Sequence, residues 1–155
     1  MANYFLNQAK GRFRELVGRV DGNDPTNAAI ILVPLSASET EANAQDTDDL
    51  TAFLATAANE QTAGGWVRKT LTDADFAATD FDVNDTDNRG DASLPQVTWT
   101  GPTAGSNTTG LAVCYDSDTT AGTDANIVVL SHHDFAVTAD GNDVILNAGD
   151  FGRAS

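Results

Sequence analysis

The 155-residue sequence is poor in residues that mark several classes of protein. Its single cysteine, Cys114, rules out a disulfide within the chain. Cys114 lies in the apolar run 111–115. This context favours a small buried side chain over a nucleophile, because a reactive thiol needs a nearby base and partial exposure. No apolar run approaches the roughly 18 residues of a membrane-spanning helix, so we expect no membrane contact.

Basic residues are also scarce. Eight Lys and Arg stand against 23 Asp and Glu, which gives a formal net charge of −15. Such a field repels phosphates, so we expect no nucleic-acid partner. Basic partners or simply a solvated acidic surface would both account for the acidity. With 41% hydrophobic residues the chain is globular, and its length suits one domain.

The C-terminal half is a ladder of short apolar segments separated by Asp, Thr, Gly and Asn. The segments are Gln96–Thr100, Gly110–Tyr115, Asn126–Ser131, Phe135–Ala139 and Asp143–Asn147. This spacing is typical of an antiparallel β-domain. Asp140-Gly141, between the last two segments, predicts a type I′ hairpin, in which both central residues have positive φ.

The first half adds further elements. The apolar run 28–35 predicts a strand buried on both faces, with Pro34 at a sheet edge or a strand end. Asp46 is expected to cap a helix over 47–58, and 66–72 alternates like a strand with one face in water. The expected fold class is mainly β: an antiparallel sandwich or barrel-like domain with an N-terminal helix and one further short helix.

Residues 1–20 are predicted to form a helical docking segment, followed by a single β-rich domain over 21–155. Phe5, Ala9, Phe13 and Leu16 recur with helical spacing. The segment also holds four of the eight basic residues and one acid. This charge split suggests contact with an acidic surface of another copy or another protein. Alternatively, the helix closes one end of the sandwich, its cations paired with the chain's own Asp residues. The expected docking residues are Phe5, Arg12, Phe13, Arg14 and Arg19.

The most acidic stretch, 80–91, follows a weaker predicted strand over 76–83. Its oxygen-bearing residues fall at the ligand positions of a twelve-residue calcium loop. Against this reading, Asp85 stands where the sharp turn needs glycine, and the flanks resemble strands rather than helices. Ordinary turn chemistry is the alternative. The calcium candidates are Asp80, Asp82, Asn84 and Asp91, and no other cofactor is expected.

No catalytic set stands out, so we expect no enzyme. His132 and His133 are neighbours on a predicted strand and would point to opposite faces, which argues against joint metal binding. Ser131, His132 and Asp134 are adjacent in sequence, but adjacency is not triad geometry. Trp66 and Trp99 could stack on sugars or, more often in such domains, fill the core.

The layout resembles that of virion structural proteins of tailed phages of about this length. The similarity rests on the opening MANYFLNQAKGRF, on AIILV and GLAVCYDSDT, and most closely on the ending FAVTADGNDVILNAGDFGRA. It implies a non-enzymatic accessory protein, such as a head decoration or head-fibre component. It further implies a homo-oligomer that docks on the major capsid protein or other virion proteins. The expected location is the capsid surface rather than the tail, after assembly in the host cytoplasm. The alternative is a tail- or fibre-associated β-module that binds calcium or carbohydrate.

Overall fold

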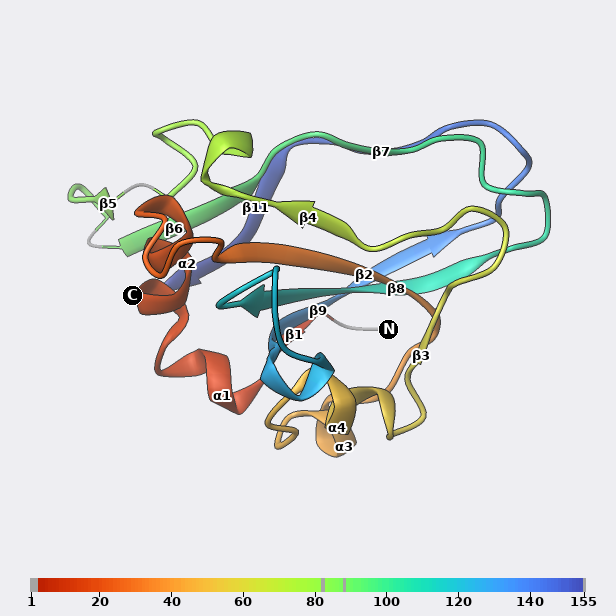
Figure 1. Cartoon of the computed structure of the whole chain (residues 1–155), viewed down its shortest axis with the longest axis horizontal. Coiled ribbons are helices and arrows are strands. Elements are labelled where there is room, and N and C mark those ends of the chain that lie inside the picture. The colour runs from red at the N-terminus through yellow and green to blue at the C-terminus, as the bar shows by residue number, and fades with distance from the viewer. Residues whose placement is uncertain (1–2, 82, 88, 155) are drawn as a thin grey trace.

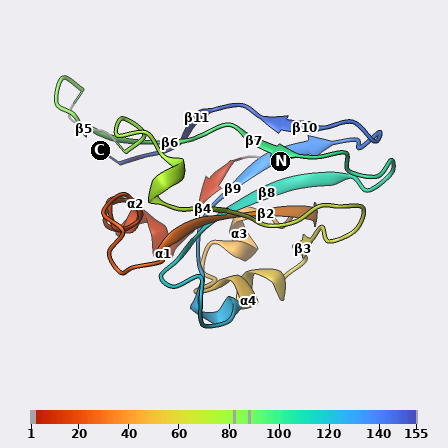
Figure 2. The ribbon, with the colours of Figure 1, turned by 45° about the horizontal axis from the view of Figure 1, so that its top comes forward.

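The computed structural model describes residues 3–81, 83–87 and 89–154. The chain is mainly β, with 35% strand and 19% helix in antiparallel sheets, which confirms the predicted fold class. The molecule has three layers (Figure 1). A central sheet lies between a smaller β layer and a layer of short helices, as the turned view shows most clearly (Figure 2).

The central sheet has six strands in the order β1-β9-β8-β2-β3, and β4 also pairs with β2. Their bounds are β1 (Tyr4–Phe5), β2 (Ala29–Ala37), β3 (Asn59–Glu60), β4 (Lys69–Leu71), β8 (Thr108–Asp116) and β9 (Val128–Val137). All of the pairings are antiparallel. The predicted segments Asn126–Ser131 and Phe135–Ala139 were expected to be two strands, but β9 runs through most of both without interruption.

Strand β2 is buried on both faces, as its continuous apolar run predicted. Ile30 and Leu32 belong to the core between the central sheet and the second β layer. Ile31 and Val33 belong to a second core on the helical side. Because successive side chains point to opposite faces of a strand, only a strand with both faces covered can be apolar throughout.

Pro34 was expected at an edge or strand end, but it lies inside β2, opposite Leu111 of β8. Its carbonyl oxygen accepts a hydrogen bond from Gln61 N at 2.8 Å, on the β3 side. The N–H and C=O of a strand residue point to the same neighbour. The missing N–H therefore faces the interval between β3 and β4, and no hydrogen bond to β8 is lost.

The second β layer is one antiparallel ribbon with an interruption. Its strands are β5 (Val83–Asn84), β6 (Arg89–Leu94), β7 (Val97–Trp99), β10 (Val144–Leu146) and β11 (Gly149–Ala154). β6 pairs with β11 and β7 with β10. Leu94 lies opposite Gly149 and Val97 opposite Leu146, so the register is the same on both sides of the gap. Pro95 lies in this gap and has no N–H for the ladder.

The predicted hairpin at Asp140-Gly141 is wrong. β10 pairs with β7 rather than with β9. Gly141 has a φ of 96°, but among the described non-glycine residues only Asn23 and Asn27 have positive φ, so Asp140 does not adopt the type I′ conformation. The chain instead crosses between layers. This crossing places Val144 opposite Trp99 in the ribbon that covers the core.

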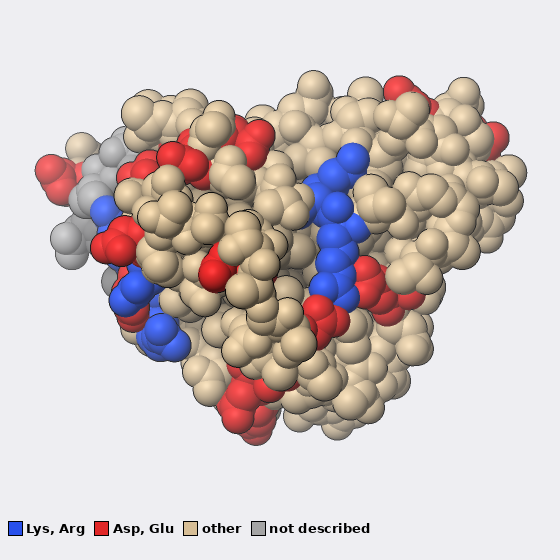
Figure 3. Space-filling model, in the orientation of Figure 1, with Lys and Arg blue, Asp and Glu red and all other residues tan. Residues whose placement is uncertain are grey.

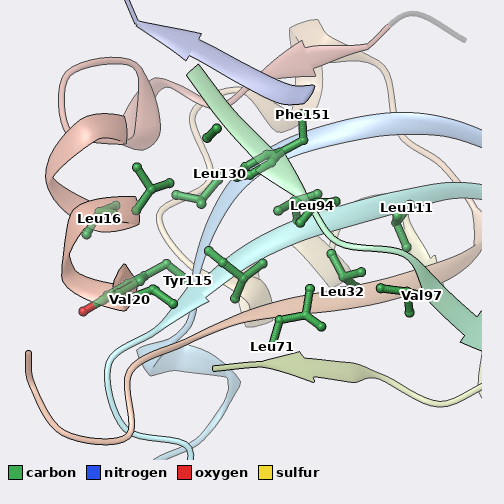
Figure 4. Packing of buried hydrophobic residues seen from close by; sticks show 14 of the residues in the cluster. Leu16, Val20, Leu32, Leu71, Leu94, Val97, Leu111, Tyr115, Leu130 and Phe151 are labelled. Atoms are coloured by element: carbon green, nitrogen blue, oxygen red, sulfur yellow. The ribbon is translucent and has the colours of Figure 1, made fainter. Parts of the chain in front are cut away.

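The prediction of one continuous N-terminal helix is also wrong in its first half. Phe5 lies in β1, and α1 (Asn7–Lys10) ends at Gly11 before α2 (Phe13–Asp21) begins. On α2, four apolar side chains are buried in the core between the central sheet and the ribbon: Phe13, Leu16, Val17 and Val20. Figure 4 shows Leu16 and Val20 facing Leu130 and Tyr115 of the central sheet.

Two short helices cover the other face of the sheet: α3 (Glu41–Ala44) and α4 (Leu50–Leu54). The helix predicted over 47–58 is thus shorter than expected. Its cap is Asp49 rather than Asp46, because the Asp49 side chain accepts a hydrogen bond from Ala52 N at 2.8 Å. The strand expected over 76–83 does not form across 76–81, which follows the 3₁₀ turn η1 (Asp73–Asp75). A second turn, η2 (Asp124–Asn126), precedes β9.

Candidate docking surface

A hollow of about 440 Å³ opens where the N-terminal segment meets the C-terminal strand. We call it the N-terminal hollow. Its lining combines aromatic rings with charged side chains: Asn3, Tyr4, Phe5, Lys10, Phe13, Glu41 and Arg153. Two of the predicted docking residues, Phe5 and Phe13, therefore lie in the same depression.

The aromatic part of the hollow is fixed by ring packing. The rings of Phe5 and Phe13 meet edge to face with centroids 5.2 Å apart, and Phe13 meets Phe151 at 5.6 Å. Phe13 is buried, whereas Phe5 is partly exposed. Edge-to-face pairs of this kind contribute about 0.5–1.5 kcal/mol beyond area burial. The floor is therefore a packed cluster of rings, of which Phe5 is partly exposed.

Tyr4 joins this floor to the helical layer. Its ring stacks on His132 with centroids 4.9 Å apart and an interplanar angle of 13°. Its hydroxyl donates a 3.0 Å hydrogen bond to the Glu39 carbonyl oxygen. Burial, followed by the charge of Glu39, raises the pKa of Tyr4 to about 12, so the phenol stays neutral. These contacts anchor β1 as an integral edge strand.

Two cations stand at the rim of the hollow. Lys10 Nζ lies 3.7 Å from Glu41, and both side chains are about half exposed. Arg153 contacts Asp91 at 3.1 Å and Asp150 at 2.9 Å, and is 56% exposed. The Lys10–Glu41 pair is exposed, and pairs of this kind contribute about 0–1 kcal/mol. Lys10 can thus exchange its present partner for a carboxylate of a docking protein at little cost. Arg153 is held more firmly, because the Asp91 side chain that it contacts is only 19% exposed and its Oδ1 is buried.

The three arginines predicted to dock lie on the exposed side of α2, outside the lining of the hollow. Arg12 and Arg19 both bond Glu15, at 3.3 and 3.0 Å. The hydrogen bond from Arg12, and next that from Arg19, lowers the pKa of Glu15. Arg14 lies along Gly90 of β6. Arg12 and Arg19 thus pair within the chain, as the alternative expected, but with Glu15 of the same helix rather than with Asp residues.

Figure 3 shows the Lys and Arg side chains of one face in two groups, one beside α2 and one across β4. Arg68, directly before β4, bonds both Glu60 and Asp124 through its guanidinium at 2.6–2.8 Å. These bonds to Asp124 and Glu60 raise the pKa of Arg68. They clamp β3 and the loop before β4 to η2, which is a structural role.

Sequence reasoning missed Lys10 and Arg153 as rim residues. Lys10 belongs to the basic segment 1–20, so it could have been included among the expected docking residues. Arg153 carried no local signal, because its place beside Phe5 and Phe13 follows from the packing of β11 under α2. Such a contact between the two ends of the chain cannot be read from neighbouring residues.

The calcium candidates do not form a wrapped loop in the described residues. Val83 lies opposite Gly90 in a hairpin of β5 and β6. Asp91 contacts Arg89 at 2.9 Å and Arg153 at 3.1 Å, and Asp80 accepts a hydrogen bond from Ala77 N. Asp82 lies outside the described residues, as does the side chain of Asn84. Within 3–81, 83–87 and 89–154, no group of three or more His, Cys, Asp or Glu is placed to hold a metal.

The two histidines lie on opposite faces of β9, as predicted. His132 is buried against Tyr4, while His133 Nε2 lies 2.8 Å from Ser131 Oγ. Burial, with a smaller contribution from His132, lowers the pKa of His133 to about 4. The imidazole of His133 is therefore neutral at pH 7.

The remaining chemically distinctive side chains belong to the cores. Trp66 and Trp99 are 2% and 0% exposed, with centroids 5.4 Å apart, so a sugar-stacking platform of these residues is wrong. Cys114 is buried, and burial raises the pKa of its thiol. It therefore packs as a small apolar side chain.

Comparisons with models of known protein families, with curated proteins and with solved structures each found no match. In the part of the chain that the structure describes, no helix has the length and apolar character needed to span a membrane.

Proposed function

We propose that this chain is a non-enzymatic structural protein of a tailed virus particle, a capsid decoration or accessory protein that docks on the major capsid lattice. The similarity of both ends of the sequence to such proteins supports the proposal. The observation that carries it is the N-terminal hollow, whose lining combines a partly exposed aromatic ring with two half-exposed cations on a chain of net charge −15.

The chemistry of the hollow suits an acidic and apolar segment of a partner. Aromatic and arginine side chains are enriched where protein interfaces concentrate their binding energy. Phe5 offers apolar area, while Lys10 and Arg153 offer charge. The acidic remainder of the surface would repel the same partner, so the orientation of docking follows from charge.

The partner meets a preformed surface in this proposal. β1, α1 and α2 are integrated into the sheet edge and the core, so their exchange between copies would uncover buried side chains. Docking as a rigid body costs less ordering entropy than folding of an arm on the partner. Many copies on one lattice, assembled as homo-oligomers, would make modest individual contacts sufficient.

Two pairs of substitutions test the surface. Lys10→Gln with Arg153→Gln removes both cations of the hollow, and Arg12→Gln with Arg19→Gln removes the same charge from the exposed side of α2. Binding is measured by co-sedimentation with virus particles assembled without this chain, and folding by thermal melting. We expect the first pair to lose at least tenfold in affinity and the second to lose less than threefold.

Retention of binding by the Lys10 and Arg153 pair would contradict the hollow as the docking site. Loss confined to the Arg12 and Arg19 pair would move the site to α2. Failure of the unchanged protein to bind such particles would contradict the proposed function itself.

A further inference from the structure

A second, smaller cavity of about 210 Å³ lies between the central sheet and the ribbon, at the β9 edge. We call it the sandwich-edge cavity. Its walls are mostly apolar: Leu94, Leu111, Val113, Phe135, Leu146 and Phe151. Figure 4 shows Leu94, Leu111 and Phe151, which come from three different strands, in the same core.

The cavity follows from the interruption of the ribbon. The ladder between β6–β7 and β10–β11 stops at Pro95 and resumes in the same register. Gly149 lies directly opposite Leu94 and lines the cavity without a side chain. A β-carbon added at Gly149 would meet no described atom within 4 Å. We therefore attribute the cavity to two residues, Pro95, which interrupts the ribbon, and Gly149, which has no side chain.

Polar side chains also line this space: His133, Asn3 and Asn147 are uncharged, and Asp134 and Asp150 are carboxylates. His133 contributes its imidazole, and Ser131 Oγ engages its Nε2 at 2.8 Å. Nδ1 is the imidazole nitrogen that does not contact Ser131. At the mouth, the Asp150 carboxylate accepts a hydrogen bond from Ser93 Oγ at 2.8 Å and contacts Arg153.

We propose that the sandwich-edge cavity binds a small molecule without negative charge that combines a phenyl- or hexyl-sized apolar group with one hydrogen-bonding group, which bonds His133. The size is appropriate, since an apolar cavity of about 150 Å³ accommodates benzene. An anionic ligand is disfavoured because the carboxylates of Asp134 and Asp150 line the same space and would repel it. The cavity adjoins the N-terminal hollow, since Asn3 lines both and Asp150 pairs with Arg153.

Three probes of one shape separate the charge states: benzyl alcohol, benzylamine and benzoate. We expect benzyl alcohol to shift the methyl NMR signals of Leu94, Leu111 and Val113 and to raise the melting temperature in a saturable way. Benzylamine should bind at least as tightly, because Asp134 and Asp150 attract its charge, whereas benzoate should bind at least tenfold more weakly. Equal binding of all three, no binding, or shifts spread away from these methyl groups would overturn the proposal.

Substitutions locate the site. Gly149→Leu fills the cavity and should abolish the benzyl alcohol shifts, whereas Gly11→Leu adds the same side chain at another position with open space and should not. His133→Leu should keep toluene binding but lose the preference for benzyl alcohol over toluene. Binding that survives Gly149→Leu would sink the assignment. If that variant does not fold, the chemical-shift map of the unchanged protein decides.

Discussion

The ring of Phe13 lies over Gly152, so close that a β-carbon at position 152 would collide with the ring edge and with Phe5. Helix α2 and the last strand, β11, thus meet at a point where position 152 has room only for the hydrogen atom of glycine. This contact places Phe5, Phe13 and Arg153 in one hollow. The candidate docking surface is therefore a product of long-range packing between the two ends of the chain.

We expect Gly152→Ala to destabilise the protein by about 1–3 kcal/mol, the usual cost of overpacking a close-packed site. Gly149→Ala is the matched control in the same strand, where a β-carbon meets open space, and should change stability by less than about 0.5 kcal/mol. Urea unfolding followed by tryptophan fluorescence measures both. Equal stability of the two variants would contradict the close contact.

Removal of residues 1–20 is expected to abolish cooperative folding rather than to release an independent β-domain. The deletion strips Phe13, Leu16, Val17 and Val20 from the main core, and full burial of such side chains contributes about 1.5–3 kcal/mol each. Domains of this size have a total stability of only about 5–15 kcal/mol. A sharp melting transition and dispersed NMR signals in the truncated protein would refute this expectation.

A point substitution gives the same information without deletion. Leu16→Ala should cost about 2–5 kcal/mol, because the buried side chain leaves a cavity that the core cannot close. Arg14→Ala, on the exposed side of the same helix, should cost less than about 1 kcal/mol. Chemical denaturation of both variants checks the difference.

A strand could be predicted from the sequence where its own residues indicate how it is buried. The continuous apolar run of β2 requires two covered faces, and the structure covers both. The partner of β10 could not be predicted in this way. The Asp140-Gly141 signal favours a local hairpin, but pairing with β7 lets Val144 and Leu146 pack against the main core. Burial over many residues outweighed one turn preference.

The candidate site shows the same limit. Phe5 fits helical spacing with Phe13, yet it lies in β1, which pairs with the edge of β9 and places Phe5 opposite Ser131. The prediction that Phe5 and Phe13 lie together is therefore correct, but the helical spacing on which it rested is wrong. Arg153 could be placed at the hollow only once the pairing of β11 with β6 was known.

Glu39 is expected to be the most important carboxylate of the helical layer. Its side chain accepts hydrogen bonds from Thr40 N at 2.6 Å, Ala57 N at 3.1 Å and the Asn43 amide at 3.2 Å. The bonds from the Thr40 and Ala57 backbone lower the pKa of Glu39. Glu39→Ala leaves those amides without their acceptor and should lower the melting temperature well below that of the unchanged protein.

Glu41→Ala is the control for Glu39, since Glu41 is exposed and pairs with Lys10 across 3.7 Å. It should leave the melting temperature nearly unchanged.

The contribution of Glu39 to stability depends on pH with a defined sign, because its pKa is lowered in the folded state. A lowered folded-state pKa gives stability that is complete above the ordinary value and is lost as the pH falls through the folded value. Equal melting temperatures for the two variants at pH 7 would remove Glu39 from this role.

His133 should make the protein less stable in mild acid. Its pKa is about 4 in the folded state against 6.5 ordinarily, so the unfolded chain binds the proton first. Stability is therefore complete above pH 6.5 and declines as the pH falls toward 4, by up to about 3 kcal/mol. Urea unfolding at intervals between pH 4 and 7 measures the decline.

His133→Gln isolates this contribution, because glutamine can still bond Ser131 but does not titrate. The carboxylates with lowered pKa values lose stability in the same direction, and they are common to both proteins. The unfolding free energy of the unchanged protein minus that of the variant should therefore fall steadily from pH 6.5 to pH 4. A difference that stays constant over this range would mean that His133 is already protonated, or remains neutral, in both states, and the burial argument for its pKa would fail.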